Sequence, residues 1–166
     1  MVAPEADSGG SSSDVEAVRA VLHAYCRLLD ARDVPTLLDQ VYAVDAVDDR
    51  RRTVLRGHKA IGEYFEGAES IIEATAHFLV NVDIEVTGKT ARAASRVLAS
   101  HWFLNRAHVG PVRPSDCVLI GTYDDALERL PQGWRITHRT VGALGPGGLL
   151  MGEMPDLFRG FGGASS

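Results

Sequence analysis

The chain has 166 residues, of which 45% are hydrophobic and 23% charged, and its formal net charge is −5. This length and composition are typical of one globular domain with a substantial core. The negative balance does not favour nucleic acid or anionic lipid as a partner, and no apolar run approaches the length that spans a bilayer. We interpret the basic run Asp49-Arg50-Arg51-Arg52 as a solvated turn, with nucleic-acid contact as a distant second reading.

Residues 1–13 are rich in Gly and Ser and lack the apolar stretch of a signal peptide, so we expect a disordered lead-in and a cytoplasmic protein. The two cysteines, Cys26 and Cys117, lie far apart and outside any CxxC or Cys/His metal spacing. We therefore expect reduced thiols, no metal site and no cofactor. The sequence also lacks a GxSxG serine motif and a P-loop.

The first half of the chain predicts helices. Apolar residues recur every three or four positions over residues 14–31, with Asp14 as the N-cap. Asp33 is expected to cap a second, shorter helix that has Pro35 in its first turn. Residues 43–56 are predicted to be irregular apart from a short strand at 53–55. A third helix is expected to open at Gly57 and to continue through Ile72.

The second half predicts long strands at residues 77–86, 91–104, 115–129 and 134–141, separated by turns at 87–89 and 131–133 and by a loop at 105–114. Helices followed by an antiparallel meander indicate an α+β fold. We expect a cone-shaped half-barrel over residues 14–142, in which the N-terminal helices pack on a strongly curved, mostly antiparallel sheet. The Gly/Pro-rich tail, residues 143–166, carries apolar side chains that are expected to cover the pocket or a partner.

Several motifs occur in a distinctive order: Tyr25-x4-Asp30-x2-Asp33, Gly57-x2-Ala60-Ile61, His77-x3-Asn81, Gly121-Thr122-Tyr123-Asp124-Asp125 and Gly133-Trp134-Arg135-Ile136-x2-Arg139. Over residues 14–142 the chain resembles the SnoaL-like group of the nuclear transport factor 2-like superfamily. That resemblance implies the cone-shaped fold, often as a dimer, and chemistry without a metal or organic cofactor. Members include scytalone dehydratase, steroid isomerases, a bile-acid dehydratase and polyketide cyclases. Several of the dehydratases use an Asp–His pair as base.

The resemblance implies that Asp30 and His77 form this pair. Asp30 ends the first helix, where a carboxylate opposes the helix dipole and serves no cap, although an exposed helix-end acid is the alternative. Strand alternation places His77 on the face opposite Phe78 and Val80. A bulge is therefore needed to aim His77 at the pocket.

Two further residues are candidates for catalysis. His101 lies among small residues on one face of its strand, where a polar ring needs a partner or a ligand. The resemblance implies a second pocket histidine there, and a satisfied core histidine is equally compatible. Tyr25 lies on the apolar stripe of the first helix and could stabilise an enolate, or it could simply be core.

Six further residues are proposed as substrate contacts: Tyr42, Tyr64, Phe65, Phe103, Tyr123 and His138. His138 shares its strand face with Trp134 and Ile136, whereas Arg139 points the other way and is interpreted as structural. Trp102 lies opposite His101, which predicts an outer or dimer-facing position.

The sequence thus predicts a cofactor-independent lyase or isomerase that removes a proton from a small hydrophobic substrate such as a polyketide, steroid or aromatic compound. Dehydration, isomerisation and cyclisation share that step. Abundant Ala, Arg, Val and Gly hint at a high-GC bacterial genome and so at natural-product biosynthesis. The alternative is a non-catalytic binding or assembly module of the same fold, with a dehydrogenase-accessory subunit as a weaker third. A homodimer is expected.

Overall fold

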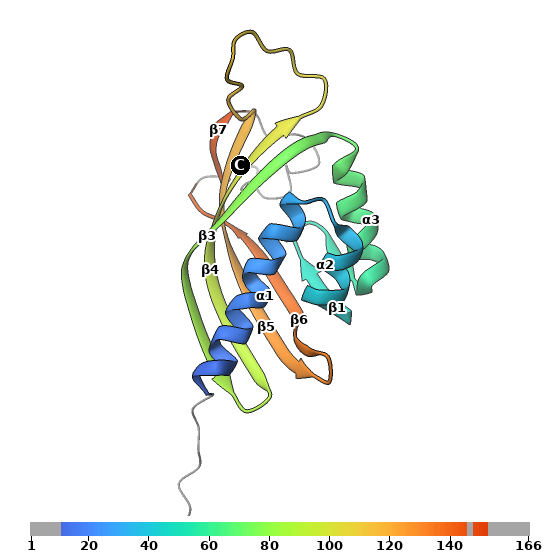
Figure 1. Ribbon diagram of the computed structural model, residues 1–166, viewed down its shortest axis with the longest axis vertical. Coiled ribbons are helices and arrows are strands. Elements are labelled where there is room, and N and C mark those ends of the chain that lie inside the picture. Colours follow the sequence, from blue (N-terminus) through green and yellow to red (C-terminus); the bar gives the residue numbers. More distant parts are fainter. Residues whose placement is uncertain (1–10, 146–147, 153–166) are drawn as a thin grey trace, which may run out of the picture.

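The computed structural model describes residues 11–145 and 148–152. Its helices are α1 (Ser12–Asp30), α2 (Val34–Val41) and α3 (Gly57–Glu69). Its strands are β1 (Tyr42–Asp49), β2 (Val54–Arg56), β3 (Ile72–Thr87), β4 (Thr90–Phe103), β5 (Cys117–Leu130), β6 (Gly133–Ala143) and β7 (Leu149–Gly152) (Figure 1). Within these ranges no helix is both long enough and apolar enough to cross a membrane.

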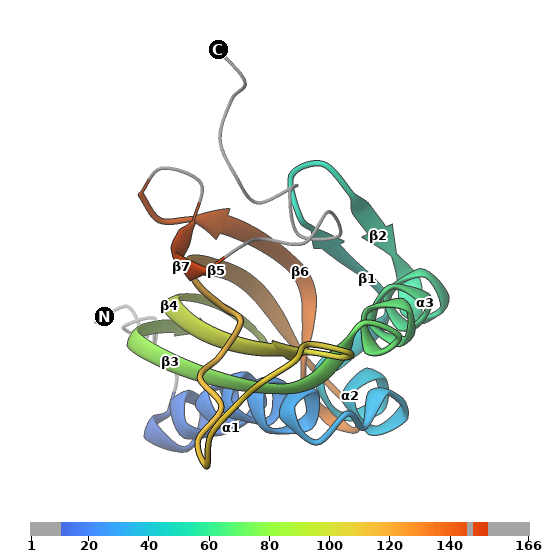
Figure 2. The same cartoon turned by 90° about the horizontal axis from the view of Figure 1, so that it is seen from above.

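The strands form one curved sheet in the order β2-β1-β6-β5-β4-β3. All neighbours in this order are antiparallel except β1 and β6, which run parallel. β7 pairs with the first residues of β5, beyond the stretch of β5 that pairs with β6. α1 lies along β3, and α2 and α3 lie beside β1 at the far side of the sheet (Figure 2). The predicted α+β fold with a strongly curved, mostly antiparallel and unclosed sheet is confirmed.

The ends of α1 are set by local hydrogen bonds. Ser11, not Asp14 as predicted, is the N-cap, because its hydroxyl accepts from the Asp14 amide at 3.3 Å. The Asp14 carboxylate instead accepts from Trp134 Nε1 at 3.2 Å and so ties α1 to β6. Asp33 caps α2 as expected, since its carboxylate accepts from the Thr36 amide at 3.1 Å.

Two element boundaries differ from the prediction. The stretch expected to be irregular forms β1, which pairs with both β2 and β6. α3 stops at Glu69 and does not continue through Ile72, which begins β3. The Ser70 hydroxyl donates to the Gly67 carbonyl at 2.6 Å, and the following β-branched residues Ile71 and Ile72 favour extended backbone.

A bulge in β3 reverses which residues face inward. The register with β4 shifts between Val80 and Asp83, and Asn81 adopts a φ of 52° in the left-handed region. Before the bulge His77 faces the interior, while Phe78 and Val80 remain exposed on the outer face. Beyond it the partly buried Val82 packs against the core. The bulge that His77 required is therefore present in its strand.

A second bulge corrects the prediction for β6. The register between β5 and β6 shifts so that Ala126 pairs with His138 whereas Leu127 pairs with Ile136. The extra residue turns His138 out to solvent and brings Arg139 into the core, where it is fully buried. Simple alternation had predicted the reverse orientation for both side chains.

The C-terminal segment returns to the sheet as far as it is described. The amide of Ile120 donates to the carbonyl of Gly148 at 2.7 Å, and β7 follows. The apolar tail residues Met154, Leu157 and Phe158 lie outside the described residues.

Candidate functional site

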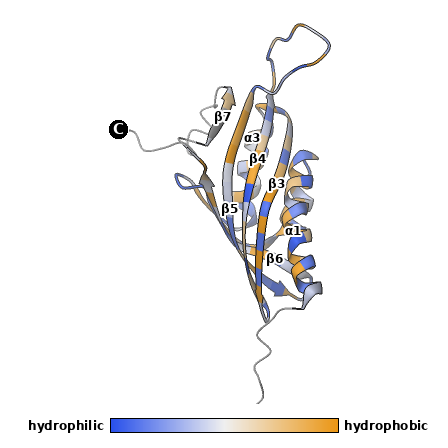
Figure 3. Ribbon diagram, turned by 90° about the vertical axis from the view of Figure 1, so that its left-hand side faces the viewer, coloured by the Kyte–Doolittle hydropathy of each residue, from blue (hydrophilic) through white to orange (hydrophobic). Residues whose placement is uncertain are grey.

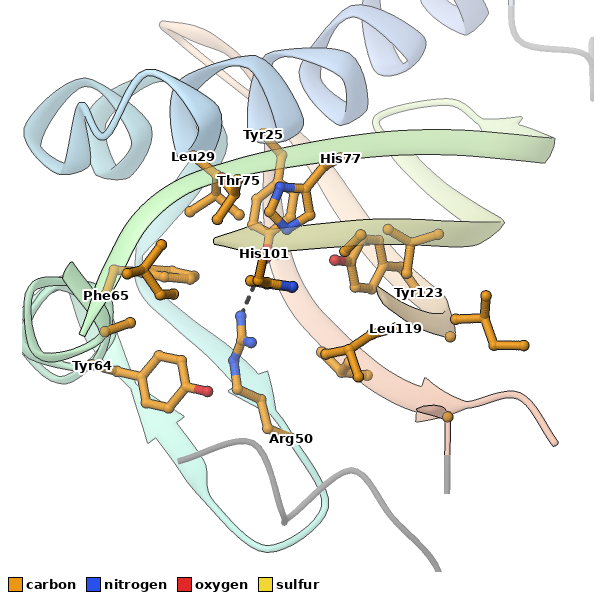
Figure 4. A pocket seen from close by; sticks show the side chains of 18 of the residues that line it. Tyr25, Leu29, Arg50, Tyr64, Phe65, Thr75, His77, His101, Leu119 and Tyr123 are labelled. Carbon is orange, nitrogen blue, oxygen red and sulfur yellow. Dashed lines mark hydrogen bonds between the residues drawn. The ribbon is translucent and has the colours of Figure 1, made fainter. Parts of the chain in front are cut away.

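A cavity opens between the helices and the concave face of the sheet (Figure 4). Its volume is about 110 Å³, several times what one water molecule requires, so a small ligand has room. Most of its walls are apolar or aromatic, and polar side chains enter at a few points. The residues that line it include Tyr25, Arg50, Tyr64, Phe65, Thr75, His77, His101 and Tyr123.

Asp30 and His77 form a hydrogen-bonded pair at the wall of this cavity. His77 Nδ1 lies 2.7 Å from Asp30 Oδ1, and the His77 ring is 92% buried. Because an ionised carboxylate can only accept, Nδ1 carries the hydrogen in this pair. The lone pair of the neutral ring is then on Nε2.

The Asp30 carboxylate is held from three directions. Thr75 Oγ1 donates to Oδ1 at 2.8 Å, and the backbone amide of His77 donates to Oδ2 at 3.0 Å. Burial alone would raise the pKa of Asp30, but the hydrogen bonds from His77 and Thr75 outweigh it and lower the pKa below its ordinary value. Asp30 is therefore ionised at neutral pH and fixes the orientation and tautomer of His77.

His101 meets His77 edge to face inside the cavity, with ring centroids 5.7 Å apart. It also stacks on Phe103 at 6.4 Å. Burial, followed by the proximity of His77, lowers the pKa of His101 to about 4. His101 is consequently a neutral ring at physiological pH. The alternation of β4 had placed it on the face of the small residues, which is the face that lines the cavity.

Tyr25 is the hub of the aromatic wall. Its ring packs edge to face against Tyr42, Phe65 and Tyr123 at centroid distances of 6.2, 6.3 and 5.5 Å. The side chain is buried, and its hydroxyl oxygen accepts from Arg50 Nη2 at 3.2 Å (Figure 4). Because the oxygen already accepts, the Tyr25 hydrogen is available for another acceptor.

Arg50 is the residue that sequence reasoning missed. Far from a solvated turn, it is 8% exposed, and its Nη2 also donates to Asp48 Oδ2 at 3.0 Å. Its guanidinium carbon lies 4.6 Å from the Tyr64 ring centroid and 4.9 Å from that of Phe65. Burial would lower the pKa of Arg50, but Asp48 raises it, so the side chain stays charged. The even spacing of Ala46, Asp48 and Arg50 was the available signal, because it puts all three on one strand face.

Arg139 points inward, opposite to its predicted orientation, and forms a buried ion pair. Its guanidinium donates to both carboxylate oxygens of Asp125 at 2.7 and 2.8 Å. It also lies under the rings of Tyr25 and Tyr123, 3.9 and 4.2 Å from their centroids. This buried ion pair fixes the position of the aromatic wall.

The structure brings together only part of the predicted substrate contacts. Tyr64, Phe65 and Tyr123 line the cavity. Tyr42 lies behind it, with its hydroxyl donating to Asp48 at 2.7 Å. Phe103 is behind His101, and His138 is exposed. Among the described residues, no group of three or more His, Cys, Asp or Glu side chains could hold a metal ion.

Comparisons with known proteins agree with this architecture. The model of the SnoaL-like domain matches residues 10–140. A protein from Novosphingobium aromaticivorans described as a candidate scytalone dehydratase superposes with a TM-score of 0.68 at 21% identity, covering 78% of this chain and 83% of that one. A nuclear transport factor 2-like protein from Salmonella enterica gives 0.70 at 21% identity, with 87% and 100% covered. Kfla4162 from Kribbella flavida gives 0.72 at 18%, with 90% and 99% covered. At these identities the structural likeness establishes the fold alone. No curated protein is significantly similar to the sequence.

Proposed function

The chain belongs to the SnoaL-like domain family, and from that premise we propose that it is a cofactor-independent enzyme in which Asp30 and His77 remove a proton from a small hydrophobic substrate. The observation that supports this most directly is the 2.7 Å contact between His77 Nδ1 and Asp30 at the wall of an apolar cavity. A structural histidine would not need an ionised carboxylate held by two further donors.

In the proposed step, Nε2 of His77 takes a proton from a carbon next to a carbonyl group. The positive charge that then forms on the ring is stabilised by Asp30, which remains ionised throughout. The Tyr25 hydroxyl donates to the oxygen on which the enolate charge collects. His101, being neutral, is suited to donating a hydrogen bond from a ring nitrogen rather than to acting as a cation.

The enolate can continue in three ways that start from the same intermediate. Loss of a β-hydroxyl gives dehydration, reprotonation at a different carbon gives isomerisation, and attack on a second carbonyl gives ring closure. The walls formed by Tyr64, Phe65 and Tyr123 favour a flat aromatic, polyketide or steroid-like substrate.

The proposal can be tested without the natural substrate, by following proton abstraction itself. In D₂O, 2-tetralone exchanges its α-hydrogens for deuterium, and ¹H NMR measures the rate. We expect the wild-type protein to accelerate this exchange, and both Asp30→Asn and His77→Gln to lower the acceleration by about 10²-fold or more.

The matched control is Asp33→Asn, which changes a carboxylate three residues away. Asp33 caps α2, and Asn caps helices equally well, so this variant should exchange 2-tetralone at the wild-type rate. Equal loss in Asp33→Asn and Asp30→Asn would contradict the assignment of the base. Tight binding of the ketone with no accelerated exchange would favour the non-catalytic binding module.

A further inference from the structure

We propose that Arg50 and Tyr25 form an oxyanion site in the cavity, so that the substrate presents there an acidic oxygen, such as that of a phenol or an enolisable dicarbonyl. This inference rests on the proposed function, because it names the group that the electron sink of the proton-transfer reaction would occupy. It adds a cationic residue to a cavity whose other walls are mostly apolar.

The geometry of Arg50 leaves part of its guanidinium unused. The hydrogen bonds that Arg50 donates to Tyr25 and to Asp48 both come from Nη2. The Tyr64 hydroxyl also interacts with the guanidinium, whereas Nε is buried with no hydrogen-bond partner among the described residues. Arg50 nevertheless lines the cavity, and Figure 4 shows its side chain reaching from the end of β1 toward Tyr25.

The position of this cation is fixed before any ligand arrives. The ring of Tyr64 and the ring of Phe65 contact the guanidinium, and Asp48 anchors it from behind. A planar donor held in this way loses little freedom when it binds an anionic oxygen. The Tyr25 hydroxyl, whose oxygen is already occupied by Arg50, can direct its own hydrogen at the same ligand.

The local charges argue for an oxygen that shares its negative charge rather than for a strongly anionic group. Asp48 already compensates Arg50, and its Oδ1 is buried without a hydrogen-bond partner in the described residues. Arg139 is compensated by Asp125 in the same manner. A delocalised phenolate or enolate can therefore be stabilised here, although it shares the Arg50 guanidinium with Asp48. Removing the charge of Asp48 should consequently strengthen the stabilisation of the ligand anion.

The probe is 4-nitrophenol, because its absorbance reports directly whether it is bound as the phenol or as the phenolate. The measurement is the pKa of the bound probe, from spectra recorded over pH at saturating protein. In wild-type protein we expect a bound pKa about one unit below that of the free probe, because a nearby guanidinium favours the anion. Asp48→Asn, which keeps the cation and removes its counter-charge, should lower the bound pKa further.

Loss of Arg50 alone would strand the Asp48 charge in the core, so the neutralising variant is the double change Asp48→Asn with Arg50→Gln. The amide at position 48 can still accept from Tyr42, and circular dichroism checks that the fold is kept. In this variant the bound pKa should rise to that of the free probe or above. An unchanged bound pKa in both Asp48→Asn and the double variant overturns the oxyanion site.

The base variants separate this inference from the proposed function. In Asp30→Asn and in His77→Gln, bound 4-nitrophenol should still have a pKa below that of the free probe. Both variants should nevertheless lose most of the accelerated exchange of 2-tetralone. If exchange depends on Asp30 and His77 but the pKa of bound 4-nitrophenol is the same in wild type and in the Asp48 and Arg50 variants, the proposed enzyme function is supported and the oxyanion site is refuted. If the pKa of the bound probe responds to Asp48 and Arg50 but exchange does not depend on Asp30 and His77, the cavity binds anions and the assignment of the base is refuted.

Discussion

His77 and His101 touch in the cavity, yet their surroundings fit them for different tasks. Asp30 accepts a hydrogen bond from His77 and can balance a positive charge there. For His101, burial together with the proximity of His77 lowers the pKa to about 4. The two rings lie only 5.7 Å apart, so a positive charge on one disfavours a positive charge on the other.

His101 should make the stability of the protein sensitive to mild acid. Its pKa is about 4 in the folded chain and 6.5 when unfolded, so between these values the unfolded state binds more protons and folding weakens as pH falls. From pH 7 to pH 5 the loss should be about 2 kcal/mol. Urea unfolding at both pH values measures it.

The variant His101→Gln should remove most of this pH dependence, since glutamine does not titrate in the range. His23→Gln, on the exposed side of α1, is the matched control and should keep it. Asp30, whose pKa is lowered, loses its stabilising contribution only at pH values below 3.8. It therefore does not contribute to the change in stability measured between pH 7 and pH 5. A His101→Gln protein that weakens as much as wild type between pH 7 and 5 would show that another group is responsible.

At the level of elements, a single residue in β3 decides whether the base faces the cavity. Asn81 takes a left-handed conformation, which asparagine tolerates better than most residues. Asn81→Gly should therefore leave stability near the wild-type value, whereas Asn81→Val should cost about 1–2 kcal/mol and slow the exchange of 2-tetralone by misaligning His77. Chemical denaturation and the NMR exchange assay measure the two effects.

Asn105 offers a control for this experiment, because it has a φ of 60° but follows β4 and lies outside β3. Asn105→Val should impose comparable backbone strain without changing the rate of exchange. If Asn81→Val and Asn105→Val affected the rate equally, the bulge would have no specific role in positioning His77.

The same irregularities explain how far the sequence could predict the site. His101 was placed correctly because β4 keeps strict alternation from Ala91 to Phe103. His138 and Arg139 were predicted the wrong way round because one extra residue at a bulge inverts every later side chain in its strand. Arg50 was missed because residues 43–52 were predicted to be irregular: β1 pairs in parallel with a strand almost a hundred residues later, so its even spacing of buried residues was the one local indication of a strand.

At the scale of the whole molecule, the outer face of the sheet carries an apolar row that the helices do not cover. Phe78 lies opposite Leu98, and Leu98 lies opposite Ile120, so the row crosses β3, β4 and β5. Phe78 is 57% exposed and Val80 is 48% exposed. Figure 3 shows hydrophobic residues recurring along these strands. Trp102 also lies on this side, but its Nε1 donates to the carbonyl of Arg113 and the residue is half-buried.

We propose that this row is the contact surface of a homodimer, as the family resemblance implied. A twofold axis near the row would bury Phe78 of each copy against the other sheet, and Arg96 and Asp124 on the same face could pair across it. Phe78→Asp places a charge in that contact and should yield monomers, as measured by sedimentation at equal protein concentration. Val109→Asp, in the loop between β4 and β5 where Val109 is 98% exposed, should leave the wild-type mass unchanged. A wild-type protein that sediments as a monomer, or a Phe78→Asp protein that stays dimeric, would contradict this interface.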